Sequence, residues 1–327
     1  MADEVKDTQN IKTVSIITTF YNAQSFVLNA VNSIYQQNFD SNIINIEYVI
    51  VDDKSEDESR KLVEQYILDH PKKGLQYKIV EPEKNLGCGG ARKFGIENAS
   101  GMYYMFLDAD DYYIHTDFVE RAVHDIEEDN ADIVEYGIIF NQANGQQMNN
   151  TSPQKIVFDD IPTALVALYK DNLIKFNVWS KIYKKHIIDS YPYSTERTFE
   201  DVRTIPVWIS NAKRVVIMPT PEINYRATGG SIIRNNDYAT RLGTITAIAE
   251  LFERFKDEYK ILRAMYQRAM VDLEAVLHNH SSKDPAFNEM SKLNTYMLSY
   301  IYPDNYKEFT YNIDEENNGK IEKTDQK

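Results

Sequence analysis

Short apolar runs and longer amphipathic segments alternate along the first part of the chain. The runs TVSIITTFYN (13–22) and IEYVIVDD (46–53) are rich in β-branched residues and have the length of buried strands. Between them, residues 24–38 carry apolar side chains at helical spacing. The next segment starts with Ser55, which we expect to cap a helix in a capping box with Glu58. The pattern predicts strand, helix, strand and helix in succession.

The same alternation continues toward the middle of the chain. Further strands are predicted at QYKIVEP, YYMFLDADD and ADIVEYGIIF, and further helices at GCGGARKFGIENA and over roughly 117–129. Strands joined by helices pair in parallel, with helices on both faces of the sheet. Ligands of such sheets bind at the carboxyl ends of the strands. The acids that follow Val51 and Leu107 are therefore expected to converge on one crevice.

The C-terminal part has a different pattern. From about residue 238 the apolar positions recur three and four residues apart, which predicts helices. We expect these helices to pack on the preceding domain or on a partner subunit of a homo-oligomer. The final segment, DEENNGKIEKTDQK, has too little apolar surface to fold by itself.

Composition and charge limit the classes of function. The chain has 327 residues, of which 43% are hydrophobic, enough for one large domain or two ordinary ones. It has no apolar run of about 18 residues and no signal-peptide pattern at MADEVKDTQN, so we expect no integral membrane segment and a cytoplasmic protein. The single cysteine, Cys88, cannot form an intrachain disulfide. A net charge of -14 does not favour nucleic-acid binding, although a local basic patch would not be excluded.

Four segments, in chain order, resemble the motifs of family-2 glycosyltransferases with the GT-A fold. They are VSIITTFYNAQSFVLNAVNSIYQQ, VIVDDKSEDES, NLGCGGARKFGIENASGMYYMFLDADD and FEDV, and the resemblance covers roughly residues 13–235. The chain departs from the family at Thr19, where proline is usual, at Lys54, where glycine is usual, and at Lys93, where asparagine often stands. The Lys54 departure is expected to alter the nucleotide pocket.

The resemblance implies an α/β fold of the GT-A type, a Rossmann-like mixed sheet flanked by helices, with a C-terminal helical extension. The predicted organisation is a disordered N-terminal tail (1–11), the GT-A catalytic domain (12–236), a C-terminal helical region (237–310) and a polar, disordered tail (311–327).

Asp108 and Asp110 match the D-x-D motif of the family. Bare carboxylates would repel the diphosphate of a nucleotide-sugar by roughly 4 kcal/mol per pair of charges at 4 Å. A hard divalent cation, magnesium or manganese, turns the same acids into an anchor. The same acids are also compatible with a solvated turn or with a phosphatase of the haloacid-dehalogenase type. The phosphatase motif would need a small hydroxyl or β-branched residue and a glycine after the second acid, where this chain has Asp111 and Tyr112.

The resemblance also assigns residues to the donor nucleotide. These are Thr19, Tyr21, Asn22, Asp52, Asp53, Gly87, Arg92, Asp108, Ala109 and Arg226. Asp53 is expected to accept the N3–H of uridine and Asp52 to brace its loop, with helix capping by both acids as the alternative. The glycines of NLGCGGARKFGI would let the backbone approach the ligand, and their spacing does not match a dinucleotide loop.

Glu200 and Asp201 match the E-D pair of the family. The resemblance makes Asp201 the general base on the acceptor hydroxyl, which needs such a base because it is a poor nucleophile. Glu200 would orient the loop. The alternative is a helix N-terminus that favours acids. Trp179 and Lys181 are candidate acceptor contacts. Some relatives supply a histidine to the metal, but this chain has none between 187 and 277, which leaves the third protein ligand open.

The sequence therefore predicts an inverting, metal-dependent glycosyltransferase. It would move a sugar from a nucleoside-diphosphate donor, expected to be a UDP-sugar, to a hydroxyl of an acceptor, expected to be a glycan. The alternatives are a nucleotide-sugar-binding protein without transfer activity and transfer to a protein, a lipid or a modified nucleic-acid base. The sequence does not favour a nucleotidyltransferase, because the glycine-rich and basic signature of that class is missing near the first strand.

Overall fold

The computed structural model describes residues 11–141, 146–226, 238–279 and 285–304. The chain divides into two compact units, one made of Met1–Ala164 and Leu173–Gly230 and the other of Leu165–Asn172 and Ser231–Lys327. The predicted C-terminal tail and almost all of the predicted N-terminal tail lie outside the described residues.

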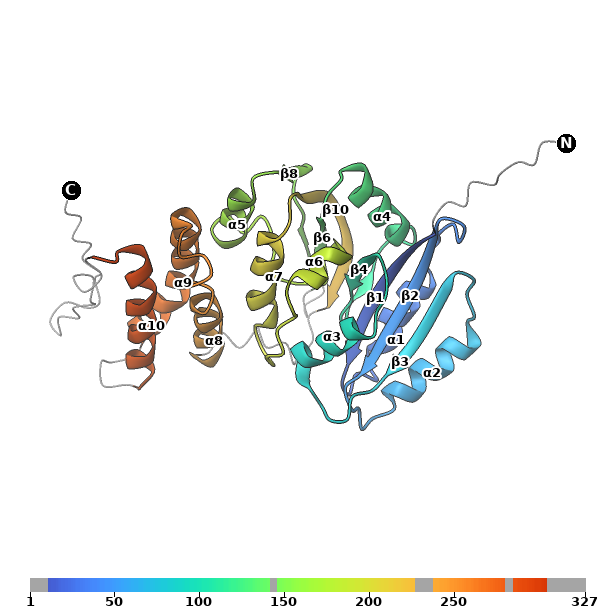
Figure 1. The fold of residues 1–327 in the computed structure, drawn as a ribbon. Coiled ribbons are helices and arrows are strands. Elements are labelled where there is room, and N and C mark those ends of the chain that lie inside the picture. Colours follow the sequence, from blue (N-terminus) through green and yellow to red (C-terminus); the bar gives the residue numbers. More distant parts are fainter. Residues whose placement is uncertain (1–10, 142–145, 227–237, 280–284, 305–327) are drawn as a thin grey trace. The chain divides into compact units, whose positions relative to one another are not determined.

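The first unit contains a mixed ten-stranded sheet (Figure 1). Four parallel strands form one half, in the order β3-β2-β1-β4, and the order then continues β9-β6-β10-β5. Strand β9 runs antiparallel to both β4 and β6, which makes the sheet mixed as predicted. The strands are β1 (Lys12–Phe20), β2 (Ile44–Asp52), β3 (Leu75–Val80), β4 (Tyr103–Phe106), β5 (Tyr112–Tyr113), β6 (Ile133–Asn141), β7 (Gln147–Asn150), β8 (Ile156–Phe158), β9 (Lys181–Lys184) and β10 (Val215–Arg226).

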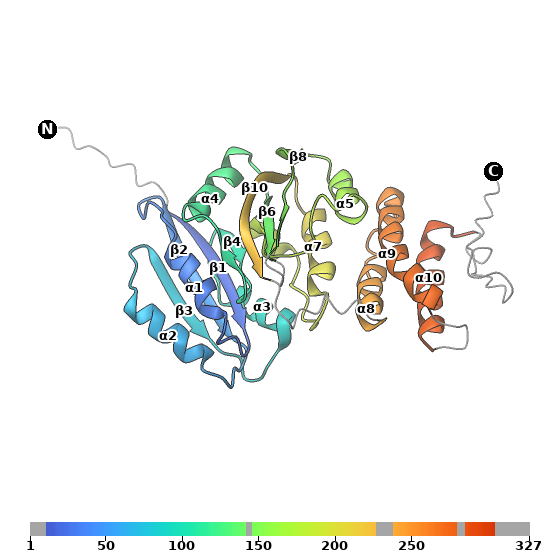
Figure 2. The ribbon, with the colours of Figure 1, turned by 180° about the vertical axis from the view of Figure 1, so that it is seen from behind.

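Seven helices begin in the described residues of this unit. They are α1 (Val27–Tyr35), α2 (Ser59–Asp69), α3 (Gly87–Glu97), α4 (Phe118–Glu128), α5 (Ile161–Tyr169), α6 (Lys185–Ser190) and α7 (Glu200–Ser210). The pairing of Ile17 with Phe106 puts these two side chains on one face of the sheet. Gly95 of α3 packs on Ile17, and Trp208 of α7 stacks on Phe106, so α3 and α7 cover that face. Helices α1 and α2 cover the other face, which Figure 2 turns toward the viewer.

The buried face of the sheet explains why these segments form strands. All residues of β2 except Asn45 are buried, as expected for a strand with helices on both faces. A cluster of large aromatic side chains, Phe106, Tyr183, Tyr193 and Trp208, fills the space between β4, β9 and α7. Trp208 of this aromatic cluster lies on α7, the helix that begins with Glu200 and Asp201.

Two local predictions were wrong. Helix α2 begins at Ser59 and not after Ser55, and Glu58 at its N-cap makes no capping hydrogen bond with its side chain. The side chains of the 55–59 segment instead bind the neighbouring loop, which the helix pattern alone cannot reveal. The helix predicted over 24–38 is shorter at both ends, Val27–Tyr35.

Within 238–279 and 285–304, the described part of the second unit's C-terminal segment, the chain forms three helices, and the unit also includes the last residues of α5. They are α8 (Tyr238–Ala249), α9 (Tyr259–Asn279) and α10 (Pro285–Ile301), and α9 packs against both of the others. Ile245, Met265 and Met290 are fully buried, and Asp272 pairs with Arg241 and Arg268. Among the helices that the structure describes, none has both the length and the apolar character needed to cross a membrane. Assembly through these helices stays a prediction.

Candidate active site

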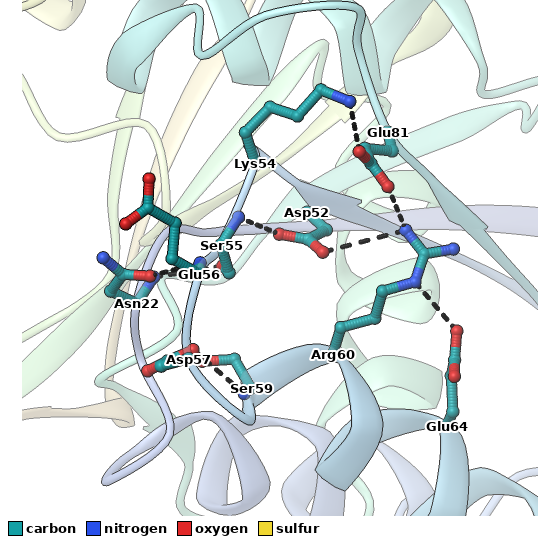
Figure 3. Close-up of polar contacts among 10 residues, drawn as sticks. All are labelled: Asn22, Asp52, Lys54, Ser55, Glu56, Asp57, Ser59, Arg60, Glu64 and Glu81. Carbon is teal, nitrogen blue, oxygen red and sulfur yellow. Dashed lines mark hydrogen bonds and ion pairs between the residues drawn. The ribbon is translucent and has the colours of Figure 1, made fainter.

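The loops after β1 and β2 are bonded to each other at the carboxyl edge of the sheet (Figure 3). The backbone N–H of Asn22 donates to Ser55 Oγ over 3.0 Å, and Asn22 Oδ1 accepts from the N–H of Glu56 over 2.8 Å. Farther along, the N–H of Gln24 donates to Asp57 Oδ2 over 3.1 Å, and the N–H of Ala23 donates to the Ser59 hydroxyl. These bonds make one preformed wall from two strand ends.

Asp52 fixes this wall from inside. Its Oδ1 accepts from the N–H of Ser55 over 2.8 Å, and its Oδ2 lies 3.7 Å from Arg60 Nη1. Arg60 also pairs with Glu64 and Glu81 (Figure 3). The side chain of Asp52 therefore braces its own loop and points toward Arg60. Both of its oxygens are already engaged within the protein.

Lys54 occupies the position where the family usually has glycine, and the backbone explains the preference. Its φ is 69°, in the left-handed region that costs a side-chain-bearing residue about 1 kcal/mol or more. Its ammonium pairs with Glu81, which follows β3 (Figure 3). The lysine at this position thus adds an ion pair with Glu81, and it strains the backbone because of its positive φ.

Asp53 joins the end of β2 to the start of α3. Its Oδ1 accepts from the N–H of Leu86 over 2.7 Å, and its Oδ2 accepts from the N–H of Gly87 over 2.8 Å. Burial raises the pKa of Asp53, and these two N–H groups and Arg197 oppose the rise. Asn85 extends the junction, because its amide donates to Asp53 O and its Oδ1 accepts from Arg197. Each carboxylate oxygen retains a second lone pair for a ligand donor.

The remaining residues predicted for the nucleotide lie along the same edge. Thr19 near the end of β1 is half-buried, and the Tyr21 side chain is 50% exposed. The exposed ring of Tyr21 is available for stacking. Gly89 allows a close approach within the protein, because a Cβ there would collide with the backbone oxygens of Ser194 and Glu196. This glycine allows α3 to approach another segment of the protein, the one that leads into α7.

Arg92 is the central cation of the site. Its side chain is nearly buried, and Nη2 donates to Asp108 Oδ1 over 2.6 Å while Nη1 donates to Glu200 Oε1. Nη1 also lies 3.4 Å from the hydroxyl of Tyr193, a residue that the sequence motifs did not single out. The guanidinium expected to reach the diphosphate is thus shared between two carboxylates from different parts of the chain.

Three acids gather where the chain leaves β4. Asp108, Asp110 and Asp111 can each offer an oxygen so that the three oxygens lie within 4.8 Å of one another. Ala109 between them is buried. Burial raises the pKa of Asp111 well above its usual value, and the charges of Asp108 and Asp110 add to the rise. Such a cluster of oxygen donors, crowded and negatively charged, fits a hard divalent cation.

Glu200 and Asp201 form the first turn of α7, and the residue before them is strained. Phe199 has a φ of 58°, in the left-handed region, and fixes the direction in which the helix starts. Asp201 Oδ1 accepts from the N–H of Val202 over 2.7 Å. Burial first, and then the charge of Glu200, raise the pKa of Asp201 to about 7, against the opposing effect of Arg92. A carboxylate with that pKa is suited to general-base work near neutral pH.

The two candidate acceptor residues differ in placement. Trp179 stacks on Tyr225 with ring centroids 5.6 Å apart and is 9% exposed, which leaves little ring area for a sugar. Lys181 is buried in an ion pair with Glu135, 3.1 Å away, and also donates to Lys175 O over 2.8 Å. The expectation that Lys181 contacts an acceptor is corrected, because its ammonium holds the 175–177 segment together.

Arg226 ends β10 beside the acid cluster. Its backbone N–H donates to Asp111 Oδ1 over 2.9 Å, and its guanidinium lies 5.7 Å from the centre of the Phe26 ring. Residues 227–237, which follow Arg226, lie outside the described residues.

Comparison with known proteins agrees with this geometry. The family described as glycosyl transferase family 2 matches residues 15–195. Glycosyltransferase GlyG of Streptococcus pneumoniae is 23% identical over 286 residues, 83% of this chain and 91% of GlyG. Poly(ribitol-phosphate) beta-N-acetylglucosaminyltransferase TarS of Staphylococcus aureus is 30% identical over 176 residues, 50% of this chain and 29% of TarS. The chain spans 62% and 31% of the length of two further curated glycosyltransferases that it matches.

Solved structures show the same fold. A structure of S. aureus TarS residues 1–349 in complex with UDP-GlcNAc superimposes with a TM-score of 0.64 at 18% identity, covering 88% of this chain and 81% of that one. The fold is therefore GT-A, as predicted. The family match spans more than half of the chain, and the chain accordingly belongs to family 2 of the glycosyltransferases.

Proposed function

We propose that the chain is an inverting, metal-dependent glycosyltransferase that moves a sugar from a UDP-sugar to a hydroxyl group of a glycan. The observation that carries the proposal is the double engagement of Arg92 by Asp108 and Glu200. This arrangement joins the acids after β4 to the first turn of α7. The groups that hold the donor and the carboxylate that activates the acceptor then belong to one site.

The donor nucleotide lies against the wall formed by the loops after β1 and β2. Tyr21 stacks on the base, and Asp53 accepts the base N3–H with the lone pairs that Leu86 and Gly87 leave open. TarS, which has this fold, has been crystallised with UDP-GlcNAc and with UDP, and this supports a uridine nucleotide as the ligand.

Asp108 and Asp110 would hold the metal. A bound magnesium or manganese ion would stabilise the negative charge that develops on the departing diphosphate. A mannosyltransferase from Pyrobaculum calidifontis, crystallised with GDP-Man and Mn2+, has a related fold with a TM-score of 0.55 and 17% identity, and this supports a divalent cation. Arg92 adds a fixed positive charge on the protein side of Asp108.

Asp201 acts as the general base. Its carboxylate removes the proton from the acceptor hydroxyl as that oxygen bonds to the anomeric carbon. The bond from the anomeric carbon to the diphosphate oxygen breaks at the same time, and its electron pair leaves with UDP. The acceptor attacks from the face opposite the leaving group, so one displacement inverts the anomeric configuration. Glu200 keeps the first turn of α7 in place through Arg92.

A hydroxyl-bearing polymer as acceptor is supported by one relative, TarS, whose name gives poly(ribitol-phosphate) as the molecule that receives the sugar. The alternative is a nucleotide-sugar-binding protein that transfers nothing. A half-buried carboxylate with a pKa near 7 at the start of α7 favours catalysis over mere binding.

The proposal is tested with a panel of nucleotide-sugars in the presence of Mn2+ or Mg2+, with and without cell-surface glycan from the producing organism. We expect release of free UDP from one UDP-sugar, faster with glycan, and no pyrophosphate. Release of pyrophosphate would indicate a nucleotidyltransferase. Binding of the nucleotide-sugar without release of UDP would indicate a binding protein that transfers nothing. Asp110→Ala should abolish metal-dependent UDP binding in calorimetry while leaving the fold intact.

A further inference from the structure

Asp111 is a carboxylate in an unusual environment. Its side chain has no solvent exposure. Oδ1 accepts from the backbone N–H of Arg226, but Oδ2 has no hydrogen-bond donor among the residues that the structure describes. A buried polar atom without a partner is rare in folded proteins and usually marks a missing water, ion or ligand.

The surroundings of the Asp111 carboxylate point to a cation. The ligand oxygens of Asp108, Asp110 and Asp111 lie within 4.8 Å of one another. Oxygens bound to Mg2+ or Ca2+ stand about 2.0 to 2.6 Å from the ion, so two of them on opposite sides are at most roughly 5 Å apart. The three carboxylates are therefore spaced to share a single ion.

Other side chains that could bind the cation are few. Asp108 Oδ1 is committed to Arg92 Nη2 at 2.6 Å, which weakens what this carboxylate can give to a metal. The chain also has no histidine between His186 and His278. A nitrogen ligand from the segment after β10 is therefore not offered.

We propose that Asp111 Oδ2 is a third protein ligand of the divalent cation, in a set made of carboxylate oxygens. This inference rests on the proposed function, because it concerns the same metal. Since Oδ1 of the same carboxylate accepts from the N–H of Arg226, the cation would also be coupled to the end of β10. With three carboxylates, the protein holds the cation before the nucleotide arrives.

The test measures Mn2+ binding by electron paramagnetic resonance on the full chain, first without nucleotide and then with UDP. We expect the wild-type protein to bind Mn2+ alone. Asp111→Asn keeps the size of the side chain and an acceptor for the N–H of Arg226, but removes one negative ligand. It should weaken Mn2+ binding at least about tenfold, because affinity for such cations follows the charge of the ligand set.

Asp117→Asn is the matched control. It removes the same charge six residues away, at a side chain that is 64% exposed and pairs with Arg121, and should leave Mn2+ affinity unchanged. Equal Mn2+ affinity of Asp111→Asn and wild type would overturn the inference. Failure of the wild-type protein to bind Mn2+ without nucleotide would overturn it too, and this measurement needs no variant.

The proposed transferase can fail separately. If the protein binds Mn2+ through Asp111 but releases no UDP from any UDP-sugar, the third ligand is upheld and the proposed transferase activity is rejected. Normal UDP release by wild type, with unaltered Mn2+ binding in Asp111→Asn, would keep the activity and assign the metal to Asp108 and Asp110 alone.

Discussion

Arg92 and Asp108 form an ion pair at the centre of the site, with 2.6 Å between Nη2 and Oδ1 and only 7% of the arginine side chain exposed. The same guanidinium bonds to Glu200, which is 108 residues farther along the chain than Arg92. One buried cation therefore sets the distance between the end of β4 and the start of α7. The loop after β4 and the first turn of α7, the proposed donor and acceptor sides, are joined through it.

Arg92→Met should reduce the free energy of unfolding by about 3 to 5 kcal/mol, because it leaves the Glu200 carboxylate buried without its partner. Glu200→Gln should cost less, since Arg92 keeps Asp108. The double variant should lose about 1 kcal/mol less free energy of unfolding, or a larger margin, than the sum of the losses in the two single variants. Urea unfolding of the four proteins measures this coupling.

The control for that cycle is Lys185→Met, which removes a cation from an exposed pair with Asp189 on α6. A change below about 0.5 kcal/mol is expected there. Strictly additive effects of Arg92→Met and Glu200→Gln would show that the two residues do not interact energetically, despite their contact.

Asp201→Asn should stabilise the protein at alkaline pH. The folded-state pKa of Asp201 is raised from 3.8 to about 7, so the folded protein holds a proton that the unfolded chain has lost between these values. Wild-type stability therefore falls as pH rises through this window. The pKa difference sets an upper limit of roughly 4 kcal/mol, and partial exposure to solvent lowers the expected gain to about 1 to 2 kcal/mol.

Thermal unfolding of wild type and Asp201→Asn at pH 4 and pH 8 measures this gain. The variant should be more stable at pH 8 and equal to wild type near pH 4. A gain of the same size at both values would mean that the carboxylate charge is not its cause.

Lys54→Gly should be more stable than Lys54→Ala by about 1 kcal/mol, because glycine adopts a φ of 69° without the penalty that a Cβ brings. Both variants lose the pair with Glu81, so the difference isolates the backbone. Lys61, 81% exposed on α2, is the control, since glycine there should be less stable than alanine by about 1 kcal/mol. The same order at both positions would contradict the strain at Lys54.

Asp53→Asn should weaken binding of UDP more than binding of ribose 5-diphosphate, because the amide cannot accept from the base and from both loop N–H groups. The expected difference is about 1.5 to 3 kcal/mol, the size of a hydrogen bond to a charged group. Calorimetry with the two ligands measures it. Equal losses would mean that Asp53 acts only by holding Leu86 and Gly87 in place.

The fold could be predicted from the sequence because strands and helices are indicated by local patterns of residues. Apolar runs that end in acids, as at Val51 and Leu107, predict both the strands and the edge at which Asp53 and Asp108 lie. The confirmed family follows from motifs at those strand ends. Helix starts were less predictable, because Ser59 bonds to another loop rather than to its own helix.

The details of the site depend on contacts between distant residues. Nothing near Lys181 in the sequence indicates that Glu135 will bury its ammonium, and nothing near Arg92 indicates that Glu200 will bind it. Asp111 was visible as one of three acids, but its unpartnered oxygen follows from the packing around it. Burial of charged side chains is set by tertiary structure, which no short motif encodes.

The central claim is that Asp201 is the base of a working transferase, and the most direct measurement is sugar transfer by Asp201→Asn at saturating donor. Loss of the base should lower the rate by roughly a hundred- to ten-thousandfold. The affinity for the UDP-sugar should barely change, because the residue does not hold the donor. Transfer at a near-normal rate, or donor affinity lost in step with the rate, would contradict the account and leave the acceptor hydroxyl without a base.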